Sequence, residues 1–136
     1  MPKDDQIELY IEECVPFAEG TEFGEVGPYE RFKGRTRFAV NPETPELAGI
    51  VDLDKAPRNA RGLVEFTTDV FLLVPAKPER GNRRLFFDYG NRANKRALQF
   101  FNDAPASNDP LTVADAGNGF LFRRGYTIAW AAWQGD

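Results

Sequence analysis

Histidine is absent from this 136-residue chain, and cysteine and serine occur once each, as Cys14 and Ser107. Catalytic sites of the Ser-His-Asp or Cys-His type use an imidazole as general base, so this chain cannot assemble one by itself. Zinc sites draw mainly on cysteine and histidine, and the sequence has neither a CxxC nor an HExxH spacing. The sequence therefore predicts no catalytic residue, no metal site and no cofactor within its own length.

Long apolar runs and complete phosphate-binding loops are also missing. No stretch approaches the roughly 20 apolar residues that a membrane helix needs, and residues 1–5 lack the basic and then apolar character of a secretion signal. Neither GxxxxGK[ST] nor a full GxGxxG is present. We expect a cytoplasmic protein without a membrane span and without nucleotide chemistry of those two kinds.

Charge is distributed unevenly, although the formal net charge is only -4. The first 30 residues contain nine acidic side chains and one lysine, whereas residues 80–96 contain six basic side chains and one aspartate. Nucleic-acid-binding domains usually carry a basic excess over the whole domain rather than over one segment. We therefore expect no nucleic-acid partner.

Residues 1–80 have the hydrophobic rhythm of a β-rich lead-in. Apolar and polar side chains alternate over residues 7–12 and 31–40, which predicts half-exposed antiparallel strands. Residues 50–54 predict a short strand, and residues 63–74 predict a longer one that ends at Pro75.

Residues 81–136 have a different rhythm. The continuous apolar run at 85–87 predicts a strand buried on both faces, and residues 126–130 predict a second one. Two helices are predicted between these strands. The first rests on helical spacing over 93–101, and the second on Asp109 as N-cap and Gly125 as the residue that ends the helix. We expect a parallel strand-helix-strand (βαβ) unit here, an α/β fold class, and one structural unit over residues 1–136.

Several blocks of the sequence resemble a known family. "FGEVGPYERFKGR", "RLFFDYGNR" and "DAGNGFLFRRGYTIAWAAWQGD" are similar to the N-terminal part of the α/β-hydrolase domain-containing proteins, and the resemblance covers nearly the whole chain. Members of that group run to several hundred residues. The resemblance therefore implies a partial α/β-hydrolase fold, with an antiparallel β lead-in followed by one parallel βαβ unit, and a partner in the remainder of the hydrolase domain.

The function that this resemblance implies is ester cleavage by a serine hydrolase, to which this chain supplies sheet and an oxyanion-hole loop but no triad residue. In that fold the nucleophile sits in a later GxSxG turn, and Ser107 has neither of the flanking glycines. The loop after the strand at 85–87 would contribute one oxyanion N–H, which makes Gly90, Asn91 and Arg92 the candidates. The chain alone is expected to be inactive.

Each of these features also has a simpler interpretation. Gly90 and Asn91 equally fit an ordinary turn that ends a strand. Trp130 and Trp133 fit a ligand platform, but large aromatic side chains more often fill cores or interfaces. The alternative function is a free-standing β-rich binding or interaction domain.

Two further expectations remain, one for the pair Asp52 and Asp54 and one for residues 126–133. Asp52 and Asp54 would share one face of a strand, where a solvated surface is favoured over a cation or acid-base site. Residues 126–133 would form an exposed sheet edge, and we expect self-association through it or through an adjacent strand edge.

Overall fold

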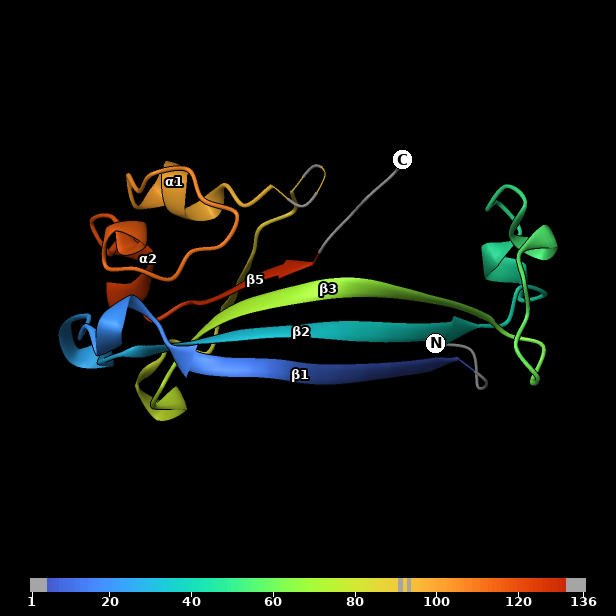
Figure 1. Cartoon of the computed structure of the whole chain (residues 1–136), viewed down its shortest axis with the longest axis horizontal. Helices are drawn as coiled ribbons and strands as arrows, with labels where there is room; N and C mark the ends of the chain where they lie inside the picture. The colour runs from blue at the N-terminus through green and yellow to red at the C-terminus, as the bar shows by residue number, and fades with distance from the viewer. Residues whose placement is uncertain (1–4, 91, 93, 132–136) are drawn as a thin grey trace.

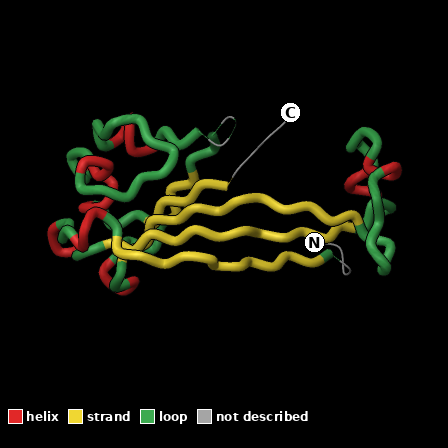
Figure 2. The backbone as a smooth tube through the Cα atoms, viewed as in Figure 1, coloured by secondary structure: helices red, strands yellow, loops and turns green. Residues whose placement is uncertain are grey.

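The fold is a single mixed β-sheet with loops and short helices gathered at its two ends (Figures 1 and 2). The computed structural model describes residues 5–90, 92 and 94–131. Its five strands lie in the order β1-β2-β3-β5-β4. Their bounds are Gln6–Pro16 (β1), Tyr29–Val40 (β2), Val64–Pro75 (β3), Leu85–Phe87 (β4) and Thr127–Ala131 (β5).

The three long strands form an antiparallel ribbon, as the alternation at 7–12 and 31–40 and the strand predicted at 63–74 indicate. β1 pairs with β2 and β2 pairs with β3 along nearly their full lengths. β5 then pairs antiparallel with β3 on one side and parallel with the short β4 on the other. The antiparallel strand predictions for the first half of the chain are therefore confirmed.

The predicted fold class is wrong. The chain is mostly β-sheet, and the two α-helices among its described residues, α1 (Ala97–Phe101) and α2 (Phe120–Arg123), span about one turn each. It is therefore neither an α/β fold nor the partial α/β-hydrolase arrangement with a parallel βαβ unit. Side chains bind backbone groups in the segment predicted as the second helix: Asp115 accepts hydrogen bonds from the N–H groups of Leu111 and Thr112. Such bonds compete with continuous helix.

Two strand predictions differ from the structure, one in the existence of the strand and the other in its burial. Residues 50–54 form turns instead of a strand, and Asp52 lies in the left-handed region at φ 60° before the 3-10 turn Leu53–Lys55. β4 is an edge strand with Leu85 62% exposed, so it is not buried on both faces.

The predicted exposed edge at residues 126–133 is wrong for the centre of β5, because Ile128 and Ala129 pair with β3 on one side and with β4 on the other. Trp130 and Ala131 pair with β3, and residues 132–136 lie outside the described residues. The outer strands of the sheet are β1 and β4.

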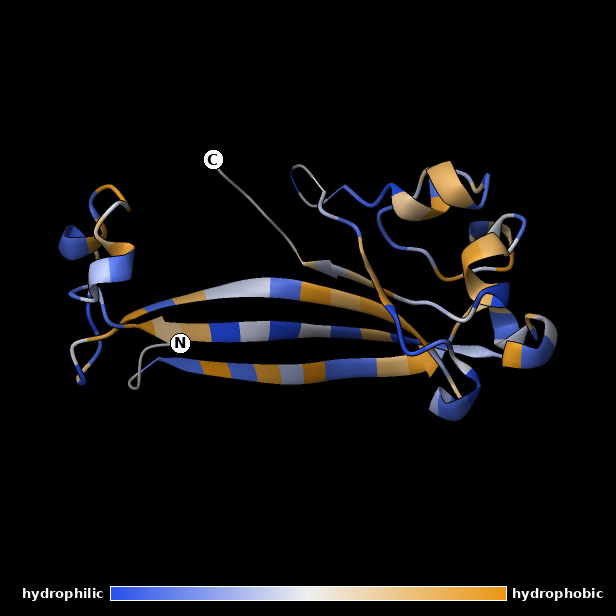
Figure 3. Cartoon of the chain, turned by 180° about the vertical axis from the view of Figure 1, so that it is seen from behind, coloured by the Kyte–Doolittle hydropathy of each residue, from blue (hydrophilic) through white to orange (hydrophobic). Residues whose placement is uncertain are grey.

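The two faces of the sheet differ in what they contact. One face, here called the helix face, packs against α1, α2 and the loops. Its contributions to the hydrophobic core are Tyr29, Phe71, Leu73, Ile128 and Trp130. The other face, here called the open face, carries the side chains that alternate with these, and several of its apolar residues remain about half exposed. Figure 3 shows apolar and polar residues alternating along the ribbon.

One irregularity sits in the middle of β1. Ile11 pairs with Gly34 and Glu13 pairs with Lys33, so Glu12 is an extra residue that forms a β-bulge. A Cβ atom at Gly34 would overlap the carbonyl oxygen of Tyr10, so only glycine fits opposite the bulge. No helix in the described part of the chain is long and apolar enough to cross a membrane.

Candidate functional site

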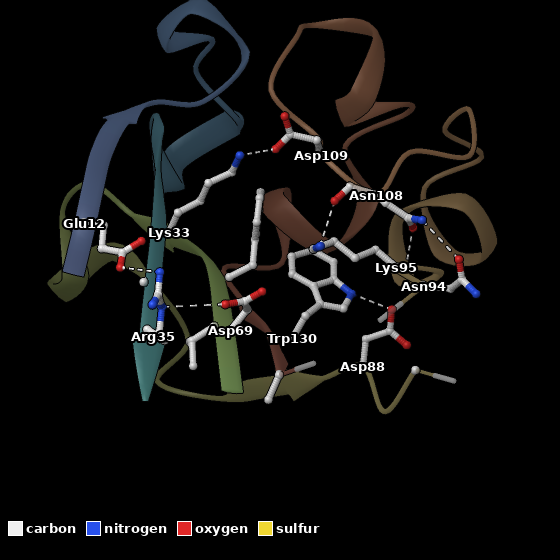
Figure 4. A pocket seen from close by; sticks show the side chains of 15 residues that line it. Glu12, Lys33, Arg35, Asp69, Asp88, Asn94, Lys95, Asn108, Asp109 and Trp130 are labelled. Carbon is white, nitrogen blue, oxygen red and sulfur yellow. Dashed lines mark hydrogen bonds and ion pairs between the residues drawn. The ribbon is translucent and has the colours of Figure 1, made fainter. Parts of the chain in front are cut away.

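A pocket of about 450 Å³ opens on the helix face, next to the end of β5 (Figure 4). Strands β2, β3 and β5 contribute Lys33, Phe71 and Trp130 to its wall. The segments after β4 and after α1 contribute Lys95 and Asp109. Its volume falls within the range of roughly 300–1,000 Å³ that is typical of small-molecule sites.

The floor of this pocket is aromatic. Phe71 and Trp130 are direct cross-strand partners on β3 and β5. Their ring centroids lie 5.5 Å apart in an edge-to-face arrangement, and the two residues are only 6% and 4% exposed. Trp130 therefore belongs to the core and touches the pocket from below, whereas Trp133 lies outside the described residues.

Asp88 fixes the orientation of the indole. Its Oδ2 atom accepts a 2.5 Å hydrogen bond from Nε1 of Trp130. The same oxygen accepts hydrogen bonds from the backbone N–H groups of Arg96 and Ala97, at 2.7 and 2.8 Å. One carboxylate thus ties β5 to the first turn of α1 at the rim of the pocket.

Three cationic groups surround the ring of Phe71. Nζ of Lys95 lies 4.7 Å from the ring centroid, Cζ of Arg31 lies 5.2 Å away and Nζ of Lys33 lies 5.9 Å away. These distances are those of cation-π contacts. The cluster places three cations around an apolar floor, and four carboxylates also line the pocket: Glu12, Asp69, Asp88 and Asp109.

Asp109 compensates two of these three cations. Its Oδ1 atom lies 2.6 Å from Nζ of Lys33 and 2.9 Å from a terminal nitrogen of the buried Arg31. The hydrogen bond from Lys33 is the largest cause of a lowered pKa of the Asp109 carboxyl group.

Lys95 has a different environment. Its ammonium group donates a 2.7 Å hydrogen bond to the backbone carbonyl of Asn108, which is neutral. None of the ion pairs found among the described residues involves Lys95. Burial is the largest cause of its lowered pKa. The carboxylates of Asp109 and Asp69 oppose this shift, whereas the neighbouring Lys33 and Arg31 add to it. A negatively charged ligand beside Lys95 would stabilise its charged form.

The predicted oxyanion loop is only partly described. Gly90 lines the pocket, and a Cβ atom there would overlap the carbonyl oxygen of Asn94. Close backbone packing thus accounts for this glycine. Arg92 is exposed and has a φ of 54°, while Asn91 lies outside the described residues.

The aspartate pair predicted near residue 53 is a surface feature. Asp52 forms an ion pair of 2.7 Å with Lys55, and both Asp52 and Asp54 are exposed. No group of three or more potential metal-ligating side chains occurs among the residues that the structure describes.

The sequence-based reasoning singled out Trp130 and Gly90 from this pocket but missed its charged residues. Lys33 and Phe71 are 38 positions apart and meet only through the register of β2 with β3, in which they are direct partners. Lys95 belongs to the basic segment at 80–96, from which we expected no nucleic-acid partner. That basic segment was the feature of the sequence that could have pointed to a cation in the pocket.

Comparisons with known proteins give no guidance to function. No model of a known protein family matches this chain, and neither the curated proteins nor the solved structures contain a significant match.

Proposed function

We propose that this chain is a β-rich binding domain whose pocket takes a small organic carboxylate with a flat apolar body. The observation that carries the proposal is Lys95, a half-buried ammonium group that faces two further cations and has a carbonyl oxygen as its hydrogen-bond partner. A ligand carboxylate would give Lys95 the direct ion-pair contact that it does not make with any described residue. The floor formed by Phe71 and Trp130 would contact the apolar body of the ligand.

The hydrolase-segment function is a second proposal. Gly90 lies just beyond the carboxyl end of β4 and lines the same pocket, at the position that the family resemblance assigns to an oxyanion loop. A nucleophile and a histidine from outside this chain would have to complete such a site. On this proposal the chain alone does not hydrolyse activated esters, and saturable turnover that disappears in Ser107→Ala would contradict it.

The binding proposal is tested by titration calorimetry with three ligands of matched shape: benzoate, the neutral benzamide and the cationic benzylamine. Benzoate is expected to bind saturably, and the other two are not. Lys95→Met should weaken benzoate binding about tenfold or more, because an ammonium-carboxylate contact in a partly desolvated site is lost.

Lys77→Met is the matched control, since Lys77 is an exposed lysine outside the pocket. It should bind benzoate as the unaltered chain does. Equal binding of benzamide and benzoate, or unchanged affinity in Lys95→Met, would overturn the proposal.

A further inference from the structure

The open face of the ribbon carries three cross-strand rows without an ionisable side chain. The rows are Ile7–Phe38–Phe66, Leu9–Thr36–Thr68 and Ile11–Gly34–Val70. The charged residues of the same strands alternate with them and lie on the helix face, where Arg35 pairs with Glu12 and Arg37 pairs with Glu65. All the charge of this part of the ribbon is therefore segregated to one side.

The apolar side chains of these rows are accessible. Ile7, Leu9, Ile11 and Phe66 are 52%, 55%, 46% and 48% exposed. Phe38 and Phe66 stack with their ring centroids 4.8 Å apart, so they present a flat aromatic surface. Contiguous exposed apolar surface of this kind marks interaction sites in soluble proteins.

The total surface of the chain leaves room for a stable interface. The accessible surface is 8675 Å² for a mass of 15.3 kDa. A compact protein of that mass exposes about 7,100 Å², so the excess is about 1,500 Å². A standard interface covers about 800 Å² on each partner, so the open face would have to account for about half of this excess.

We propose that two copies of the chain associate through their open faces, with the sheets stacked face to face. Each copy has a net charge of -4, so two copies carry a net electrostatic repulsion. The three uncharged rows avoid that repulsion, and a two-fold axis places the same patch on both copies. Flat apolar sheet faces pack about 10 Å apart in this way. The pocket lies on the opposite face and stays accessible.

The test uses light scattering coupled to size exclusion, with two variants on neighbouring positions of β1. Leu9→Glu places a charge on the open face, whereas Tyr10→Glu places the same charge on the helix face, where Tyr10 pairs with Arg35. The unaltered chain and Tyr10→Glu should elute with twice the monomer mass of 15.3 kDa. Leu9→Glu should raise the dissociation constant about 100-fold, because a charge would be buried without a partner.

Circular dichroism verifies that both variants remain folded, and Thr68→Glu provides a second charge on the open face if Leu9→Glu unfolds. A monomer at all micromolar concentrations would overturn the proposal. A dimer that survives both open-face charges, or a ladder of larger species growing from a sheet edge, would overturn it as well.

The single cysteine supplies an independent readout. Cys14 pairs with Phe32 on the open face and is exposed in the single chain. Its alkylation by a thiol reagent should become slower as protein concentration rises through the dissociation constant. A rate that does not change with concentration, in a sample that scattering shows to be dimeric, would place the interface elsewhere and refute the proposal.

Discussion

Replacing Asp88 by alanine should destabilise the fold more than any other single change of a partly exposed carboxylate. Its Oδ2 atom accepts three hydrogen bonds, from the indole of Trp130 and from the backbone N–H groups of Arg96 and Ala97. Alanine accepts none of them. Asp88→Ala therefore leaves three donors without their partner at the junction of β5 and α1.

The magnitude follows from which donors water can reach. Arg96 is exposed, so its N–H group can be hydrated after the substitution. Trp130 and Ala97 are 4% and 2% exposed, and their N–H groups would remain largely unpaired. An unsatisfied buried donor costs about 1–3 kcal/mol, so the two together should lower the free energy of unfolding by about 2–6 kcal/mol. A domain of this size has about 5–15 kcal/mol in total.

Urea denaturation followed by tryptophan fluorescence measures this loss, with Asp54→Ala as the control. Asp54 is an exposed carboxylate on a turn, and its removal should change the free energy of unfolding by less than about 0.5 kcal/mol. Asp88→Asn, which keeps one acceptor oxygen, should fall between the two. A loss below about 1 kcal/mol in Asp88→Ala would refute the reasoning, because the three hydrogen bonds would then contribute little.

Two remaining predictions concern buried polar groups. Tyr29→Phe should cost about 1–3 kcal/mol in the same urea assay, because the hydroxyl group lies 2.8 Å from the carbonyl of Tyr126 and 3.2 Å from that of Phe122; an unchanged midpoint would contradict this. Burial lowers the pKa of Lys95 in the folded chain. Between that lowered pKa and the usual 10.5, the unfolded chain therefore binds more protons than the folded chain. The free energy of unfolding should rise with pH in this window. Lys95→Met should remove that rise, and an identical pH dependence of the two proteins would count against the assigned burial.

The ribbon was predictable because successive side chains of a strand point to opposite faces, so a strand with one polar face has polar and apolar residues in alternation. The alternation at 7–12 and 31–40 locates β1 and β2 to within a few residues, and the longer strand predicted at 63–74, before Pro75, locates β3. Helical spacing was a weaker guide. Residues 109–125 carry a cap and a terminal glycine, and Gly125 does adopt a φ of 78°, but only Phe120–Arg123 is α-helical.

The pocket was less accessible to sequence reasoning, because its parts meet only through tertiary structure. The register of β2, β3 and β5 places Lys33, Phe71 and Trp130 in one row. No local pattern encodes a register between strands that are separated by long loops. The basic segment at 80–96 gave the sign of the charge but not the direction in which Lys95 points.

The bulge at Glu12 has a consequence for the tolerance of β1 to changes in length. A one-residue deletion elsewhere in a strand inverts the faces of every side chain beyond it. Deleting Glu12 would instead leave Ile11 opposite Gly34 and Glu13 opposite Lys33, so both faces would keep their side chains. The regular ladder would also move the carbonyl of Tyr10 away from Gly34 and release that position from its restriction to glycine. The identity of residue 34 and the length of β1 are thus coupled, and a homologous chain one residue shorter at this point would be free to carry a side chain there.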